Sequence, residues 1–405
     1  MILYNLSIQT YNVIVPNKGG KMAYMEGPAN GLEFLEKLHG ANGKKIQLFQ
    51  DLSGYLSIKA REKGIPFTGQ FELTPLCNFS CRMCYVHLNR NQLCDHPILS
   101  VETWKDLMHQ AWEAGMIKAA LTGGECLVYP GFDELFLYLH SLGCEVSVMT
   151  NGFLLNDQRI RFFQEHMPAL IQVSLYGWND DVYERVTGQR AFTAVYANIR
   201  KAIDAGLPLV ISITPNVYLG DDVLETIRAA KSICRKVLVN SSVFTPRRET
   251  GRSEHQDNVS TDLYVKIYQL LNELDGKKSN PIPEEQLPQA GGNLHECTEC
   301  GLRCGGGRSG FVIDWKGAVL PCNRLDMIRG DALADGFSEA WRTVNQEANQ
   351  WPRVPECEGC AYAKVCNNCA ANILVYGKPG KRPAELCERT RYLVKNGVWH
   401  IPDCE

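Results

Sequence analysis

The stretch FELTPLCNFSCRMCYVHL, residues 71–88, joins an apolar run to a loop with three cysteines. Cys77, Cys81 and Cys84 have the spacing C-x3-C-x2-C. Thiolates are soft ligands that suit iron–sulfur clusters and zinc. Three cysteines around a four-iron cluster would leave one iron open, and catalytic metals characteristically keep one position free. The alternative is a structural zinc site with His87 as the fourth ligand.

Outward from this loop, strand-like apolar runs alternate with amphipathic, helix-like stretches. The runs are residues 67–74, 117–122, 145–150, 170–176, 209–215 and 236–244, and the helix-like stretches are residues 101–115, 132–143, 157–167, 194–206, 222–234 and 261–276. This alternation indicates parallel βαβ units, too few for a closed eight-unit barrel. The sequence therefore predicts an α/β fold, a partial (β/α)6 TIM-like barrel.

Gly-rich and polar loops follow each strand-like run, where ligands gather in such folds. After the cysteine loop come Gly123-Gly124-Glu125, Thr150-Asn151-Gly152, Ser174-Leu175-Tyr176-Gly177, Pro215-Asn216 and Pro246-Arg247-Arg248. Arg247, Arg248 and the nearby Arg252 could bind a carboxylate or a peptide backbone, or form a solvated basic turn.

The rest of the chain divides by composition. Residues 1–65 form a small α+β segment, and residues 66–275 form the barrel. Residues 276–296 are rich in Pro, Gly and polar residues and read as a linker. Residues 297–405 form a cysteine-rich domain with short apolar pieces and few long helices.

Composition excludes several classes of function. The net charge of −3 gives no reason to expect a nucleic-acid partner. The chain begins without a basic segment and long apolar core, and no run approaches the roughly 18 apolar residues of a membrane span, so a cytoplasmic location is expected. Without export, 17 cysteines indicate metal binding or catalysis rather than disulfides.

Ten of the cysteines lie between residues 297 and 404. Apolar runs at 311–314 and 318–322 flank Gly317 and predict a hairpin that brings Cys304 near Cys322. The GGGRSG sequence at 305–310 matches a dinucleotide fingerprint in form only, since it follows cysteines and leads into a strand. Two CxxC pairs could form a zinc ribbon; the five-residue gap between Cys360 and Cys366 fits one poorly, but Cys297 and Cys300 could combine with another pair.

The order of these motifs resembles the radical SAM superfamily. Its features are CxxxCxxC followed by an aromatic residue (Tyr85), LTGGE at 121–125, TNG at 150–152, VSLYG at 173–177 and YERVTG at 183–188. The resemblance implies that S-adenosylmethionine (SAM) binds at Gly123, Gly124, Glu125, Asn151 and Ser174, beside Tyr85. Many members have arginine where Thr187 stands, so Arg185 or Arg190 could substitute as the partner of the SAM carboxylate.

Many members also have proline where Cys126 stands. Cys126 could donate hydrogen to a substrate radical, as an epimerase requires, or be a small residue that the position tolerates.

The C-terminal spacing resembles the SPASM domain, which binds auxiliary [4Fe–4S] clusters. By that resemblance one cluster takes Cys304, Cys322, Cys369 and one of Cys297 or Cys300. The second takes Cys357, Cys360, Cys366 and Cys387. One or two auxiliary clusters are therefore expected.

The resemblance implies that a reduced cluster cleaves SAM and that the resulting 5′-deoxyadenosyl radical abstracts hydrogen from a C–H bond. SPASM proteins commonly modify peptides, which predicts a ribosomally made peptide with a leader as substrate and flavodoxin or ferredoxin as reductant. Residues 1–65 would be a cap on the barrel or a reduced leader-binding segment. A small-molecule oxidoreductase and a metal-stabilised binding protein are the alternatives. Asn323, where sulfatase maturases have aspartate, disfavours sulfatase maturation.

Overall fold

The computed structural model describes residues 14–16, 22–24, 45–88, 93, 96–240, 243, 257–288, 301–366, 368–376 and 378–401. The predicted ligands Cys297 and Cys300, and the arginines at 247, 248 and 252, lie outside the described residues.

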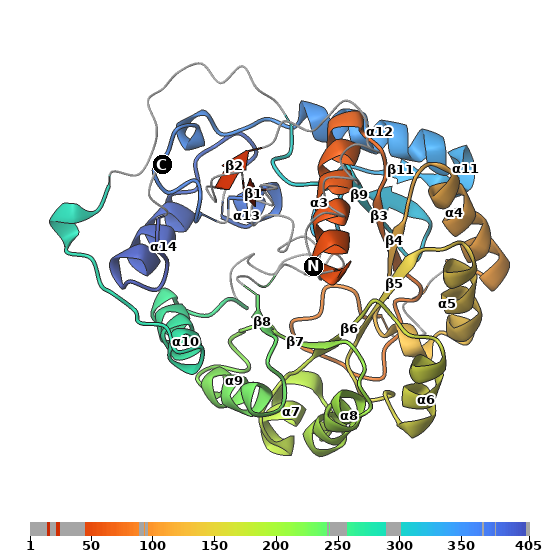
Figure 1. Cartoon of the computed structure of the whole chain (residues 1–405), viewed down its shortest axis with the longest axis horizontal. Helices are drawn as coiled ribbons and strands as arrows, with labels where there is room; N and C mark the ends of the chain where they lie inside the picture. Colours follow the sequence, from red (N-terminus) through yellow and green to blue (C-terminus); the bar gives the residue numbers. More distant parts are fainter. Residues whose placement is uncertain are drawn as a thin grey trace.

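A nine-stranded sheet organises the molecule, in the order β11-β10-β9-β3-β4-β5-β6-β7-β8 (Figure 1). Its strands from β3 to β8 are parallel neighbours. Their bounds are β3 Thr68–Glu72, β4 Lys118–Thr122, β5 Glu145–Thr150, β6 Leu170–Ser174, β7 Leu209–Ile213 and β8 Val237–Val239. Each lies within one of the six predicted runs, and the predicted α/β partial barrel is confirmed.

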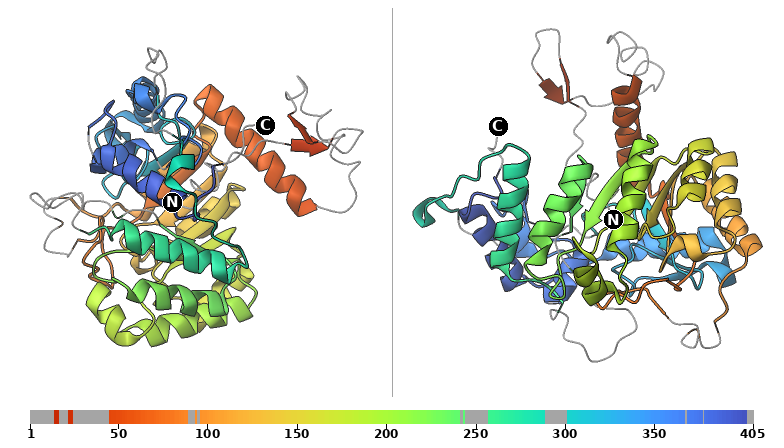
Figure 2. Two further views of the ribbon diagram at one scale, coloured as in Figure 1. Left: turned by 90° about the vertical axis from the view of Figure 1, so that its left-hand side faces the viewer. Right: turned by 90° about the horizontal axis from the view of Figure 1, so that it is seen from below.

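Helices cover the outer face of these strands (Figures 1 and 2). They are α4 Val101–Glu113, α5 Phe132–Ser141, α6 Asp157–Glu165, α7 Asp180–Thr187, α8 Phe192–Asp204, α9 Asp222–Ile233 and α10 Thr261–Leu274. Side chains before the first turns cap several of them; Ser100, for example, accepts the backbone N–H of Thr103 at 3.1 Å. Helix α7 was not predicted.

Strand alternation divides the sheet into two different faces. On β3, Phe71 points outward, where its ring meets Trp104 of α4 edge to face at 6.1 Å. Gln70 and Glu72 therefore face inward, and both are buried. Ser147, Gln172 and Ser212 are buried polar residues on other strands. The outer face thus carries the apolar core, and the inner face carries polar side chains.

The C-terminal part extends the barrel's own sheet. Its elements are β9 Gly310–Ile313, β10 Ala318–Leu320, β11 Gly330–Asp331, α11 Ala332–Asp335, α12 Phe337–Gln350, α13 Ala370–Tyr376 and α14 Ala384–Lys395, with short 3-10 turns at Glu284–Gln286 and Pro355–Cys357. β9 pairs in parallel with β3, and β10 pairs antiparallel with β9 as the predicted hairpin. Helix α12 packs beside α4, and the Phe311 and Phe337 rings lie 4.8 Å apart. Among the described residues of this part, two helices exceed ten residues, α12 with 14 and α14 with 12, as the expectation of few long helices allows.

Described parts of the N-terminal segment are β1 Ile14–Pro16, which pairs antiparallel with β2 Met22–Tyr24, and α3 Lys45–Lys63. The C-terminal end of α3 is tied to α12, because the Trp341 indole N–H donates to the Gly64 carbonyl at 2.8 Å. None of the helices within the described ranges is long and apolar enough to cross a membrane.

Candidate functional site

The cysteine loop follows β3 at the carboxyl end of the sheet and is fastened to α7. The backbone N–H groups of Ser80 and Arg82 donate to the carbonyls of Thr187 and Val186, at 2.9 and 3.1 Å. Phe79 is buried, and its ring meets Tyr183 of α7 edge to face at 6.0 Å. The short helix α7 is therefore the outer support of the loop.

The three thiols of this loop lie within electrostatic reach of one another. Burial raises the pKa of Cys77 to about 12, and Cys84 adds to the increase. Burial also raises the pKa of Cys81 well above its ordinary value, followed by the effects of Cys84 and Cys77. Such buried thiols are poor anions by themselves, and a metal centre that takes up their charge would satisfy them.

The described residues lend the zinc alternative no geometric support. No three His, Cys, Asp or Glu side chains within the described ranges converge on a position for one metal ion. A cubane spreads its ligands over different irons and so needs a wider set of sulfurs. The backbone N–H of His87 donates to Cys84 Sγ at 3.2 Å, beside that of Val86 at 3.4 Å.

The glycine turn after β4 lies directly against the start of the cysteine loop. The N–H of Gly124 donates to Thr74 O at 2.7 Å, and that of Glu125 donates to Leu76 O at 2.9 Å. A Cβ on Gly124 would lie 2.4 Å from Leu76 O, and one on Gly123, whose φ is +148°, would lie 2.5 Å from Thr74 O. Only glycine permits this approach, so these two motifs form one site.

Glu125 uses its carboxylate within the protein. Oε1 accepts from the Thr150 hydroxyl at 2.7 Å and the Leu127 N–H at 3.1 Å, and Oε2 accepts from the Asn151 N–H at 2.7 Å. Burial raises the pKa of this carboxyl, whereas these donors lower it. Glu125 thereby ties the loop after β4 to the loop after β5.

Asn151 directly follows β5, and Ser174 is the last residue of β6, on the same rim as the cysteines. The side-chain Nδ2 of Asn151 lies 3.7 Å from Cys77 Sγ. Ser174 hydrogen-bonds to the side chain of Tyr176, whose pKa is raised by burial and by nearby Cys81 and Cys84. The structure thus brings both predicted residues to the cysteine loop, and their contacts with SAM remain predictions.

Cys126 is placed differently. It begins the 3-10 turn η2, Cys126–Val128, and is fully buried in the apolar core. Its thiol donates to the Met149 carbonyl at 3.3 Å, and burial raises its pKa well above the ordinary value. This position favours the interpretation of a small core residue over that of a hydrogen donor.

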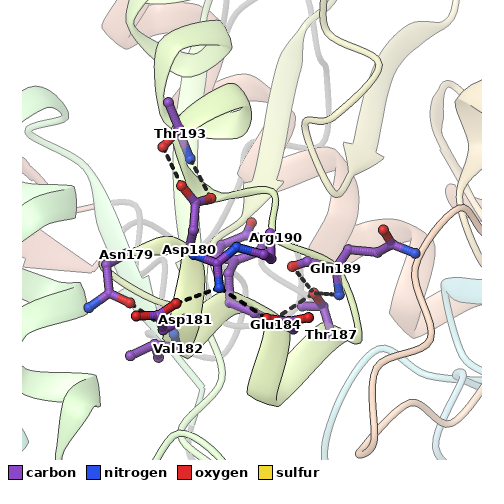
Figure 3. Close-up of polar contacts among 10 residues, drawn as sticks. Asn179, Asp180, Asp181, Val182, Glu184, Thr187, Gln189, Arg190 and Thr193 are labelled. Carbon is purple, nitrogen blue, oxygen red and sulfur yellow. Dashed lines mark hydrogen bonds and ion pairs between the residues drawn. The ribbon is translucent and has the colours of Figure 1, made fainter.

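The two arginines predicted for the SAM carboxylate form ion pairs at the surface. Arg190 pairs with Asp181 and Glu184 on α7 (Figure 3). Thr187 is buried, and its hydroxyl donates to the Tyr183 carbonyl at 2.7 Å. Arg190 is therefore not brought to the inner side of the cysteine loop.

Arg185 pairs with Asp222, and its Nε donates to the Tyr218 carbonyl at 2.8 Å. It lines a pocket of about 510 Å³ together with Arg82 of the cysteine loop. The guanidinium of Arg82 lies over the Tyr218 ring, 5.4 Å from its centre. Arg185 is thus near the loop, with its guanidinium already paired.

The C-terminal cysteines separate into two groups. Burial raises the pKa of Cys304 to about 12, and Cys322 and Cys369 raise it further. This places the three thiols within electrostatic range of one another. These three residues are the described members of the first predicted ligand set.

In the second group, burial raises the pKa of Cys366 to about 11, and Cys387, Cys357 and Cys360 add to the effect. Thr390 donates to Cys366 Sγ at 3.4 Å, and Arg382 donates to Cys387 Sγ at the same distance. These four residues are the second predicted set. Their role as ligands remains a prediction.

The two cysteine-bearing regions meet through side chains. Asn323, next to Cys322, donates its Nδ2 hydrogen to the phenolic oxygen of Tyr85, next to Cys84, at 2.6 Å. Arg324 lies near Cys322 and Tyr85. Burial lowers the pKa of its guanidinium, whereas Cys369, Cys322 and Tyr85 raise it. Arg324 belongs to none of the sequence motifs, although it directly follows Asn323.

Comparison with known proteins agrees with this geometry. Residues 71–230 match the radical SAM superfamily, and residues 304–370 match the iron–sulfur cluster-binding SPASM domain. The chain is 26% identical over 324 residues to the AdoMet-dependent heme synthase of Methanosarcina barkeri, covering 74% of this chain and 90% of the synthase. It is 27% identical over 277 residues to the sporulation killing factor maturation protein SkfB of Bacillus subtilis, covering 68% of this chain and 64% of SkfB.

Among solved structures, Streptococcus suis SuiB shares the fold, with a TM-score of 0.60 and 15% identity over 88% of this chain and 86% of SuiB. The cysteine loop, the glycine turn beside it and the described C-terminal cysteine groups lie inside the matched ranges, except for Cys387, which lies beyond the second range. Residues 71–230 thus form a radical SAM domain, and residues 304–370 form a SPASM iron–sulfur cluster-binding domain.

Proposed function

We propose that this enzyme modifies a ribosomally made peptide by hydrogen abstraction from a C–H bond, forming a thioether, a carbon–carbon or other crosslink, or an epimerised residue. The observation that carries the proposal is the polar inner face of the barrel. Gln70 on β3 and Gln172 on β6 have buried amide oxygens for which the described structure offers no donor. A buried acceptor without a partner is costly, and the N–H groups of a peptide would supply one.

The cofactors of this superfamily are SAM and [4Fe–4S] clusters. Cys77, Cys81 and Cys84 would hold the cluster, and the turn at Gly123 and Gly124 would meet SAM. When bound, this pair supplies the 5′-deoxyadenosyl radical that removes hydrogen from the substrate.

The chain's own residues then fix the geometry of the site. Phe79, Tyr176 and Tyr183 lie around the cysteine loop and limit the access of water. Asn323 and Tyr85 join the loop to the C-terminal cysteines. A substrate bound between the cysteine loop and the C-terminal cysteines would therefore be near both groups of thiols.

The relatives support a peptide substrate. SkfB is named for the maturation of a killing factor, and SuiB has been solved bound to its precursor peptide SuiA. The inference to this chain also includes a leader on the peptide and a small electron-transfer protein, such as flavodoxin or ferredoxin, as the reductant.

The test is mass spectrometry of a candidate precursor, encoded by a short reading frame near the gene, after anaerobic incubation with the reconstituted enzyme, SAM and dithionite. A loss of two hydrogens would show crosslinking or oxidation, and unchanged mass with deuterium uptake from solvent would show epimerisation. Cys77→Ala is the matched inactive control. SAM cleavage that leaves every precursor unchanged would contradict the proposal.

A second candidate is a small-molecule reaction. The heme synthase of M. barkeri is matched over 90% of its length, more than SkfB is. Formation of heme by the reconstituted enzyme, followed by its visible absorption spectrum, would favour this candidate over a peptide substrate. Sulfatase-type maturation remains disfavoured, because Asn323 cannot act as the carboxylate base that the resemblance requires.

A further inference from the structure

Asn151 is the first residue after β5, and two hydrogen bonds to the surrounding loops hold it. It is only 5% exposed. Its backbone N–H donates to Glu125 Oε2 at 2.7 Å, and its side-chain oxygen accepts the Phe153 N–H at 3.0 Å. The loop after β5 therefore presents this side chain in one orientation.

The remaining end of the amide points at the cysteine loop. Nδ2 donates to Asn78 Oδ1 at 2.7 Å and lies 3.7 Å from Cys77 Sγ. Rotating the amide by half a turn would set its oxygen against Asn78 Oδ1 and its NH2 group against the Phe153 N–H. The contacts thus fix the amide with its donor toward the sulfur.

Cys77 also receives the backbone N–H of Phe79 at 3.4 Å. Hydrogen bonds to ligand sulfurs stabilise the more negative, reduced state of an iron–sulfur cluster and so raise its reduction potential. The Phe79 donor is part of the backbone and persists in any variant. The Asn151 donor can be removed by substitution.

The buried carboxylate of Glu125 lies on the other side of the same residue. It makes the site around Cys77 more negative, which opposes the charge that reduction adds. Asn151 contacts both groups, with its backbone toward Glu125 and its side chain toward Cys77. Its amide dipole therefore offsets part of the repulsion at the first ligand of the loop.

We propose that Asn151 is a positioning residue that raises the reduction potential of the catalytic cluster by donating a hydrogen bond to Cys77. This role is distinct from the SAM contact that the sequence resemblance implies. It concerns the cluster alone and holds whether the substrate is a peptide or a small molecule.

The test is an EPR-monitored redox titration of the reconstituted full-length protein without substrate, with added SAM identifying the signal of the open-site cluster. Asn151→Ser removes the donor without adding charge, and Asn151→Asp replaces it with a carboxylate. Asn198→Ala is the matched control, since Asn198 donates to the carbonyls of Gly152 and Phe153 in the same loop, at 3.1 and 3.0 Å, without a contact to Cys77.

We expect the ratio of reduced to oxidised cluster at a fixed potential to fall about tenfold in Asn151→Ser, which is a shift of about 59 mV for a one-electron couple. The ratio should fall further in Asn151→Asp, and in Asn198→Ala it should equal that of the parent protein. Equal potentials in all variants would overturn the proposal, as would an equal shift in Asn198→Ala. Loss of cluster iron in both Asn151 variants, with iron retained in Asn198→Ala, would show a role in assembly and would also overturn it.

Discussion

Asn323 and Tyr85, which are 238 residues apart in the chain, are joined by a hydrogen bond of 2.6 Å. Each directly follows a cysteine, Cys322 and Cys84, so the bond connects the two cysteine-bearing parts of the molecule. The parallel pairing of β9 with β3 sets the frame for this contact, because it places the two chain segments side by side before they reach their loops. The catalytic loop and the C-terminal domain are thus held together at the level of the cysteines.

A double-mutant cycle tests this connection. Tyr85→Phe and Asn323→Ala each remove one partner, and the coupling between them should be about 1 kcal/mol in the free energy of unfolding, as for a typical hydrogen bond. Asn323→Asp should cost less than Asn323→Ala, since a carboxylate can accept the Tyr85 hydroxyl. The measurement is urea unfolding of all variants at one iron loading. Strict additivity of the two single variants would show that the bond contributes nothing.

The grouping of the C-terminal cysteines predicts which substitutions should resemble one another. Cys366 and Cys369 are neighbours in sequence, yet the structure places Cys366 with Cys387 and Cys369 with Cys304 and Cys322. Cys366→Ser and Cys387→Ser should therefore produce the same loss of iron and the same EPR change. Cys369→Ser should instead match Cys322→Ser.

Iron analysis and EPR of the four variants decide this, with each cubane accounting for about four irons per chain. Cys144→Ser, which alters a cysteine outside both groups, is the control and should keep full iron. A common phenotype for Cys366→Ser and Cys369→Ser, different from the phenotypes of their distant partners, would contradict the two groups.

Glu125→Gln should weaken the joint between the loops after β4 and β5. The carboxylate accepts three donors, two of which are the backbone N–H groups of Leu127 and Asn151. A carboxamide has one oxygen, so in either orientation one of these N–H groups faces an NH2 group. Because a hydrogen bond to a charged group contributes about 1.5–3 kcal/mol, we expect a destabilisation of that size.

Thermal unfolding measures the effect of Glu125→Gln. Glu184→Gln is the matched control, since Glu184 pairs with Arg190 at the exposed surface, and it should cost less than about 1 kcal/mol. Equal melting temperatures for the two variants would show that the buried carboxylate does not tie the loops.

Local sequence pattern was sufficient for the barrel. The strand-like runs and the polar loops after them are periodic features, and each of the six strands formed where the pattern predicted it. Helix α7 was not predicted because its eight residues are too few to show a clear helical period. Its start was nevertheless signalled by Asn179, whose side chain accepts the Val182 N–H at 2.9 Å.

Helix α12 was also missed, although its signal was present. Phe337, Ala340, Trp341, Val344 and Ala348 are buried and recur at helical spacing. The contacts of the site are different. No local pattern connects Tyr85 with Asn323 or Asn151 with Cys77, because these depend on how separate segments are packed. The sequence could therefore name the motifs at the site but not the bonds between them.

A pH dependence of stability should follow from Cys144, which lies outside the predicted clusters. Burial raises the pKa of its thiol from 9.0 to about 11. The folded protein thus holds this proton more tightly than the unfolded chain does. The stabilisation is complete below about pH 9, where the thiol is neutral in both states, and is lost as the pH rises from 9 through 11. One pKa unit corresponds to about 1.4 kcal/mol. Because the burial of the Cys144 thiol is not complete, the loss in the free energy of unfolding should approach about 2 kcal/mol.

Cys144→Ala removes this titration and leaves every other thiol in place. The difference in the free energy of unfolding between parent and variant should therefore shrink between pH 9 and pH 11 and stay constant from pH 7 to pH 8.5. Ser141→Ala, on the exposed surface three residues away, is the control and should show a constant difference across the whole range. A difference for Cys144→Ala that does not change with pH would mean that the folded protein does not hold the Cys144 proton more tightly than the unfolded chain.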